Sequence, residues 1–109
     1  MNLDWYQIEA NKTAEYPHYN INDIISYLGL GIAGESGEIA NKLKKVIRGD
    51  KSIDAISQDL AYELGDVLWY VSELSKELNY SLSTIAEMNL QKLAERKKNN
   101  TIKGTGDNR

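Results

Sequence analysis

Cysteine is absent from this chain of 109 residues, and proline occurs only once, at Pro17. Disulfide bridges and cysteine-based metal sites are therefore excluded. The lack of cysteine fits a cytoplasmic protein, which is the location we expect. The N-terminus has no basic region followed by an apolar stretch, so it does not resemble a secretory signal. Because no apolar run approaches the roughly 18 residues of a membrane span, we expect no membrane partner.

Histidine is nearly absent too, with His18 as its single example. A ferritin-like di-iron bundle needs a Glu-x-x-His pair on each of two helices, so that class is excluded. A Ser-His-Asp hydrolase is not credible with one histidine beside a proline, and we expect His18 to lie in a loop. The chain also lacks a glycine-rich loop followed by Lys and Ser or Thr, which excludes a P-loop nucleotide site.

The charge is unevenly distributed. Residues 92–109 hold six basic and two acidic side chains, a net charge of +4, whereas residues 1–91 carry a net charge of −7. A basic tail on an acidic body is compatible with a nucleic-acid arm, with a solvated tail, or with a phosphate-bearing ligand that the body binds through metal ions. Nucleic acid is the unlikely partner, because the candidate helices are too long and too acidic for a helix-turn-helix.

Apolar residues recur at helical spacing throughout, and no run alternates in the manner of a strand. We therefore predict an all-α protein, with a four-helix-bundle-like protomer in residues 1–98 and a flexible basic tail in residues 99–109. Ser52 is a candidate N-cap and Asn79 a candidate helix stop. The predicted helices cover residues 3–15, 21–48, 52–78 and 81–98.

The two central helices are long for so short a chain. A helix of about 27 residues measures about 40 Å, whereas a compact globule of this size is only about 35 Å across. We therefore expect a homo-oligomer, either a dimer or a dimer of dimers. The alternative is that the second helix breaks at its glycines, since four so close together need a reason such as a break or a close helix approach. These are Gly29, Gly31, Gly34 and Gly37.

Two acidic pairs carry the strongest functional signal. Glu35 and Glu38 lie on the second predicted helix, and Glu63 and Asp66 lie on the third, each pair at i,i+3 spacing. Such residues project from one helix face about 5–6 Å apart. Four carboxylates from neighbouring helices repel one another unless a cation lies among them, and oxygen ligands suit Mg²⁺, with Mn²⁺ as a substitute. The alternative interpretation is an acidic solvated face.

Cationic and amide side chains follow on the helices beyond the acidic pairs. Positive groups next to a metal–carboxylate cluster suit a polyphosphate, because they neutralise the charge that the metal leaves. The candidates for substrate binding are Lys42, Lys45, Asn89, Lys92 and Arg96. The aromatic residues are interpreted mainly as core, with base stacking as the alternative; they are Trp5, Tyr62, Trp69 and Tyr70.

Three segments resemble the MazG-like all-α nucleoside triphosphate pyrophosphohydrolases. They are GLGIAGESGEIANKLKKVIRGD, ELGDVLWYVSEL and the closing NLQKLAERKKNNTIKGTGDNR. The resemblance covers nearly the whole chain. It implies a helical bundle, Mg²⁺ bound by the four paired carboxylates, and hydrolysis of a nucleoside triphosphate to a nucleoside monophosphate and pyrophosphate. Gly34 departs from the pattern, because many relatives have an additional Glu immediately before the first pair.

On that resemblance, the metal ligands and catalytic residues are expected to be Glu35, Glu38, Glu63 and Asp66, with Glu38 as the expected base. Lys92 and Arg96, with Lys45, are expected to stabilise the pyrophosphate leaving group. The tail is expected to close over bound phosphate. Two alternatives stay open, namely a hydrolase selective for dUTP or dCTP, and a catalytically poor helical dimer that binds a nucleotide or a protein.

Overall fold

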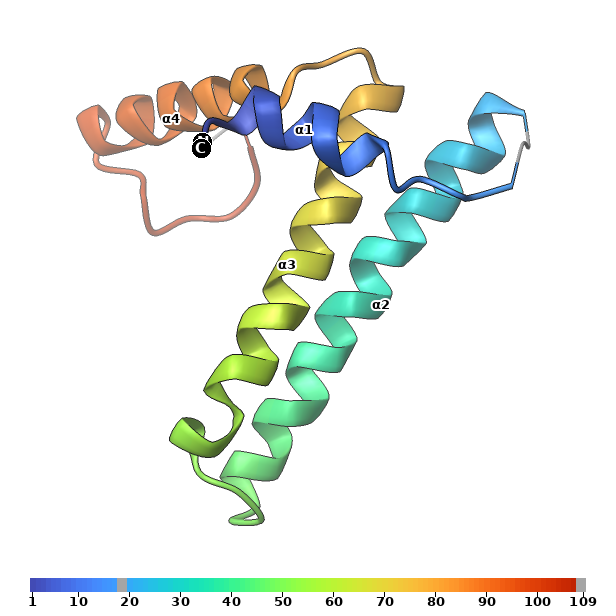
Figure 1. Cartoon of the computed structure of the whole chain (residues 1–109). Helices are drawn as coiled ribbons and strands as arrows, with labels where there is room; N and C mark the ends of the chain where they lie inside the picture. The colour runs from blue at the N-terminus through green and yellow to red at the C-terminus, as the bar shows by residue number, and fades with distance from the viewer. Residues whose placement is uncertain (18–19, 108–109) are drawn as a thin grey trace.

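The computed structural model describes residues 1–17 and 20–107, and in that part of the chain it contains four α-helices and no strand. The prediction of an all-α fold is therefore confirmed for these residues, while His18 lies outside them. Figure 1 shows the helices in chain order. They are α1 (Leu3–Asn11), α2 (Ile21–Ile47), α3 (Ile53–Glu77) and α4 (Leu82–Lys98).

Side-chain caps define where the helices begin. Asn20, Ser52 and Ser81 each accept a hydrogen bond from a backbone N–H three residues on, so the predicted cap at Ser52 is confirmed. Beyond the end of α3, Asn79 has a φ of 66°, a left-handed conformation that stops the helix as predicted.

The prediction that the first helix continues to residue 15 is wrong, because α1 ends at Asn11. The carbonyl of Ala10 accepts hydrogen bonds from Thr13 Oγ1 at 2.7 Å and from Trp69 Nε1 at 3.2 Å. Trp69 lies on α3, so a contact from a distant part of the chain fixes the end of α1. Local periodicity does not report such a contact.

The two long helices form an antiparallel hairpin, which is the longest part of the molecule in Figure 1. α2 runs through its glycines unbroken, so the close-approach interpretation holds at one of them. A Cβ atom built on Gly31 would lie 2.2 Å from the ring of Tyr70 on α3, whereas one built on Gly34 would meet nothing within 4 Å. Gly31 therefore lets the Tyr70 ring lie against the α2 backbone.

α1 crosses the upper end of the hairpin and fixes the corner between α3 and α4 (Figure 1). The Gln7 amide donates to the carbonyls of Ser72 and Tyr80 at 3.2 Å and accepts from the N–H of Leu82 at 3.0 Å. Asp4 accepts from the backbone and hydroxyl of Ser83. α4 consequently leads away from the hairpin, contacting α1 and α3 but not α2.

The apolar core within one chain is small. The buried apolar residues of the described chain are Ala10, Leu28, Ile56 and Leu82. The radius of gyration is 16.6 Å, compared with about 13 Å for a compact domain of this length. Large apolar side chains stay exposed on the long helices and on α4, among them Leu30, Tyr62, Leu64 and Leu90. Among the helices described, none has the length and apolarity to cross a bilayer.

Candidate functional site

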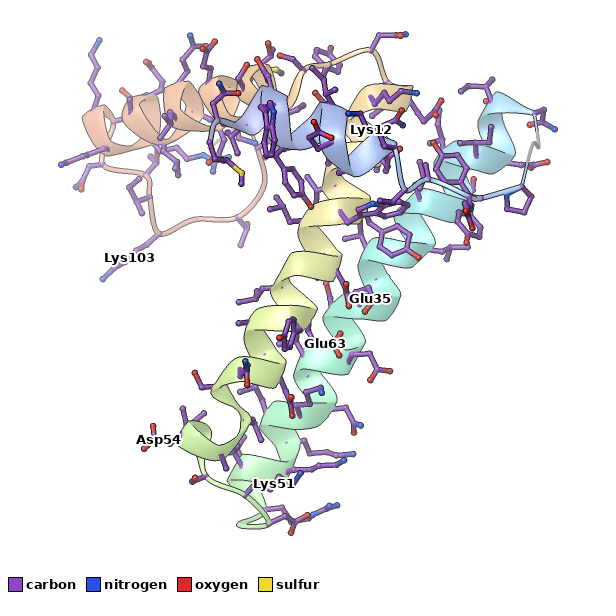
Figure 2. The ribbon with its side chains drawn as sticks, viewed as in Figure 1. Lys12, Glu35, Lys51, Asp54, Glu63 and Lys103 are labelled. Carbon is purple, nitrogen blue, oxygen red and sulfur yellow. The ribbon has the colours of Figure 1, made fainter. Side chains whose placement is uncertain are left out.

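Three carboxylates converge between the two long helices. Glu35 on α2, with Glu63 and Asp66 on α3, each offer an oxygen, and these oxygens all lie within 4.8 Å of one another. Figure 2 shows the side chains of Glu35 and Glu63 facing each other across the gap between the helices. The i,i+3 spacing on α3 places Glu63 and Asp66 on the side that faces Glu35. Tertiary pairing of α2 with α3 therefore creates the concentration of negative charge that the spacing predicted.

The electrostatics of this cluster favour a positive charge. The pKa of Glu35 is raised, mainly by burial, then by its hydrogen bond with Glu63 and the negative charges of Asp66, Glu63 and Glu38. Lys42 forms an ion pair with this cluster, with its Nζ 3.6 Å from Glu63 Oε1. The other Glu63 oxygen is buried and has no hydrogen-bond partner among the described residues. An unpaired buried carboxylate oxygen within a group of acids fits Mg²⁺, which binds oxygen ligands.

Glu38 lies one turn after Glu35, and it is exposed. Its oxygens do not belong to the group that converges, although its charge contributes to the raised pKa of Glu35. The sequence predicts that four carboxylates meet, and three of them do so in the described part of the chain. The assignment of all four as metal ligands, and of Glu38 as the base, stays a prediction.

A cavity of about 330 Å³ opens beside the carboxylates. Its walls are Thr13, Glu35, Asp66, Trp69 and Tyr70. The two aromatic rings meet edge to face, with centroids 5.1 Å apart and planes at 87°. An apolar wall next to paired acids is the arrangement expected where a largely aromatic group and a polar, metal-bound group belong to one ligand.

Our interpretation of Trp69 and Tyr70 as mainly core residues is therefore incomplete. Both are half-buried and form the cavity wall instead of an enclosed core. They follow Asp66 by three and four residues, so helical spacing alone indicated that they share its face. Helical spacing could not indicate Thr13, because it lies in the connection after α1 and not on the helix that carries Asp66. A second cavity of about 350 Å³ is lined, among the described residues, by Met1, Asn2 and Trp5, and none of these has an ionisable side chain.

A buried carboxylate holds the connection that carries Thr13. Glu73 on α3 is fully buried and accepts hydrogen bonds from Asn11 Nδ2 at 2.9 Å and the Tyr16 hydroxyl at 3.3 Å. Tyr16 also donates to Glu77 at 2.8 Å, and burial with these acids raises its pKa. On the cavity side, Trp69 Nε1 donates to Thr13 Oγ1 at 2.8 Å. The segment after α1 is thus bound at both ends to α3, which keeps the cavity wall in place.

The predicted substrate-binding side chains fall into two groups. Lys42 and Lys45 are half-buried on α2 and continue the face that carries Glu35 and Glu38. Asn89, Lys92 and Arg96 lie on α4, which is well separated from the labelled Glu35 and Glu63 in Figure 2. Asn89 and Lys92 are exposed, whereas Arg96 is buried. A single chain therefore brings the α2 cations to the carboxylates and leaves the α4 group elsewhere.

Comparison with known proteins identifies two relatives of this sequence. The MazG nucleotide pyrophosphohydrolase domain family matches residues 25–101, a range that includes the converging carboxylates and α4. The chain is also similar to the "Gene 37 protein" of Mycobacterium phage L5, at 47% identity over 116 aligned residues, covering 100% of each chain. No solved structure matches this chain significantly.

Proposed function

The chain belongs to the MazG nucleotide pyrophosphohydrolase domain family, and we propose on that premise that it is a Mg²⁺-dependent nucleoside triphosphate pyrophosphohydrolase. The reaction is that of an NTP or dNTP with water, giving the monophosphate and pyrophosphate. The observation that carries the proposal is the convergence of Glu35, Glu63 and Asp66 beside an aromatic-walled cavity. The cavity suits a nucleoside, and the carboxylates suit the metal-bound phosphates next to it. The cytoplasm remains the predicted location.

The proposed roles follow from the positions of the groups. Glu35, Glu63 and Asp66 hold the metal, and Glu38 joins them as the fourth carboxylate from one turn along α2. When bound, Mg²⁺ supplies charge neutralisation at the phosphates. A water molecule attacks the α-phosphorus, the bond to the bridging oxygen breaks, and pyrophosphate leaves with that oxygen. One carboxylate of the cluster accepts the proton of the water, and Glu38 is our choice because it is exposed to solvent.

Lys42 is the nearest cation to this chemistry, since it already pairs with Glu63. With its charge neutralised by a bound metal ion, Glu63 would no longer need Lys42 as its partner, and Lys42 would be free to pair with a phosphate oxygen. Lys45 extends the same basic face by one turn. We propose that these two lysines neutralise the phosphates closest to the cluster, while the α4 residues Lys92 and Arg96 bind a phosphate further from it.

We also propose that the working unit is a homodimer or a pair of dimers. Its support is the small core of the single chain and the exposed apolar residues of the hairpin, including Leu64 at 60% exposure. Soluble monomers rarely leave such residues grouped in the open. Sedimentation equilibrium at micromolar concentration tests this, with Leu64→Asp expected to shift the mass towards the monomer. Asp59→Asn, at an exposed position on another face of α3, is expected to leave the mass unchanged. A monomeric wild type of full helicity would contradict the proposal.

The catalytic proposal is tested by incubating the protein with Mg²⁺ and a panel of ribo- and deoxyribonucleoside triphosphates. The products are separated by chromatography. We expect monophosphate and pyrophosphate in equal amounts. Nucleoside diphosphate as the main product would contradict attack at the α-phosphorus, and no product from any substrate would favour a nucleotide- or protein-binding dimer without catalysis.

The same panel tests the narrower proposal of a base-selective enzyme. The observation behind it is that Trp69 and Tyr70 present fixed rings next to the carboxylates, held by Thr13 and Gly31 respectively. A fixed wall discriminates by shape more than a mobile one does. Preference for dUTP or dCTP within the panel would support this selectivity, whereas equal rates across bases would contradict it.

A further inference from the structure

The segment after α4 folds back onto the helix that it leaves. Asn100 has a φ of 57°, which turns the chain, and the backbone N–H of Thr101 donates to the carbonyl of Arg96 at 2.8 Å. Gly106, with a φ of 80°, makes a second left-handed turn that suits glycine. In Figure 1 this segment forms a loop beneath α4. The loop returns Asp107 to the side of the helix.

Asp107 meets two cations there with a single oxygen. Its Oδ1 accepts from Lys92 Nζ at 2.8 Å and from an Arg96 guanidinium nitrogen at 3.2 Å. The same guanidinium nitrogen also donates to the carbonyl of Gly106 at 3.4 Å. Because Lys92 and Arg96 are four residues apart on α4, both face the same side of the helix. They bind the carboxylate between them as they would bind another anion.

The two partners differ sharply in burial. The Arg96 side chain is only 8% exposed, whereas Asp107 is 80% exposed. The guanidinium is therefore a fixed part of the surface, and the carboxylate lies at the opening. Arg96 Nε is buried and has no hydrogen-bond acceptor among the described residues. Since Arg and Lys together have eight N–H donors, one carboxylate oxygen uses few of them, and a phosphate has oxygens and charge for more.

We propose that Lys92 and Arg96 form an anion-binding site that the chain's own Asp107 occupies, and that a phosphate group of the ligand displaces Asp107 and releases the loop. This inference rests on the proposed function for the identity of the ligand as a polyphosphate. Asp107 then acts as a built-in competitor, because only the fraction of molecules with an open site binds phosphate. The apparent association constant equals the intrinsic one multiplied by that open fraction.

The direct test measures binding of inorganic pyrophosphate by titration calorimetry, with the full chain and a chelator present so that no metal takes part. Asp107→Asn should bind pyrophosphate about 2- to 5-fold more tightly than the wild type, the range expected when an exposed carboxylate no longer competes for the two cations. Asp54→Asn is the matched control, because Asp54 is exposed near the start of α3 and lies well away from α4 in Figure 2. The affinity of this variant for pyrophosphate should equal that of the wild type. Equal affinity of Asp107→Asn and wild type would overturn the proposal.

A second measurement follows the loop itself. Lys103 projects from the loop into the open in Figure 2, so trypsin cleavage after it reports whether the loop is docked. Pyrophosphate should speed this cleavage at least about 2-fold in the wild type. Asp107→Asn should be cleaved faster from the outset and should respond little. Slower cleavage with pyrophosphate would overturn the proposal, because it would mean that the loop closes over the anion.

Neither measurement depends on hydrolysis, so the two proposals fail separately. If the chain passes both tests but has no pyrophosphohydrolase activity, the anion-site proposal stands and the proposed reaction is wrong. If the chain is active but Asp107→Asn changes neither pyrophosphate affinity nor cleavage, the proposed reaction stands and displacement of Asp107 by phosphate is wrong.

Discussion

The hairpin and the α4–tail region differ in the sign of the charge that they concentrate. The hairpin gathers carboxylates, and α4 presents basic side chains. Between α2 and α3, carboxylates converge and Lys42 pairs with Glu63. A buried oxygen of Glu63 has no hydrogen-bond partner among the described residues. On α4, the basic side chains Lys92 and Arg96 obtain their counter-charge from the chain itself, through Asp107. The hairpin thus has an excess of negative charge that favours a cation, whereas the positive charge of α4 is paired with Asp107. The hairpin therefore suits a metal ion and α4 suits a phosphate group, at two places that a single chain holds apart.

The largest expected effect concerns Mg²⁺ binding at the hairpin carboxylates. Glu63→Gln and Asp66→Asn should each lose most of the stabilisation by Mg²⁺, which is about 2.7 kcal/mol at a concentration 100 times Kd. They should also lose activity about 100-fold or more, because the ligands act together at one metal. Thermal melting with and without Mg²⁺, beside a pyrophosphate assay, measures both quantities.

The control for those variants is Asp59→Asn, on the same flank of α3 but outside the converging group. It should keep both the Mg²⁺ stabilisation and the activity. If Mg²⁺ stabilised Glu63→Gln and Asp66→Asn as strongly as the wild type, these carboxylates would not be the metal ligands.

The next effect tests how closely the hairpin must pack for the site to form. Gly31→Ala places a methyl group 2.2 Å from the Tyr70 ring, so we expect a loss of about 1–3 kcal/mol in the free energy of unfolding. Gly34→Ala is matched in helix and substitution but meets nothing within 4 Å, so it should be stabilising, by up to about 1 kcal/mol. Chemical denaturation of the two variants gives the comparison. Equal stabilities would show that the Tyr70 ring is not fixed against α2.

A smaller effect concerns the sign of a stability change without metal. The converging carboxylates repel one another, so Asp66→Asn should leave the metal-free protein equally stable or more stable, by about 0.5–2 kcal/mol. Asp107→Asn should show the opposite direction, since that acid lies between two cations. Melting in a chelator gives both signs, and a clear loss of stability in Asp66→Asn would mean that repulsion does not dominate in the hairpin.

The smallest effect is a titration in the tail. The Lys92 and Arg96 cations lower the pKa of Asp107 below its ordinary value of 3.8. Because the pKa of Asp107 is lower when the loop is docked, the ionised carboxylate stabilises docking at any pH above its ordinary pKa. This stabilisation is lost as the pH falls through the lowered pKa of the docked state. Lys92→Gln should therefore raise the pKa of Asp107, as followed by NMR of its carboxyl carbon. An unchanged pKa would show that Lys92 does not bind Asp107 in solution.

Local sequence features were enough for the elements and for the acidic pairs. Helical spacing and capping residues gave three helices to within a residue or two, and the helix that failed is α1, whose end depends on Trp69. The pairs at i,i+3 spacing indicated which acids meet, and three of the four do. The cavity wall was harder to predict, since Thr13 reaches it through contacts with α3 more than 50 residues away in the sequence.

By itself, the sequence determined an all-helical chain with two long apolar stripes and paired carboxylates on both. These features follow from the 3.6-residue period, which is a property of neighbouring residues. Only the tertiary structure decided that Tyr70 lies against Gly31 and that Trp69 and Tyr70 line a cavity. The same holds for the pairing of Asp107 with the cations of α4. Each of these depends on how separate helices and loops pack in space. Residue spacing along one helix tells which side chains share a face, but not which groups from elsewhere in the chain that face meets.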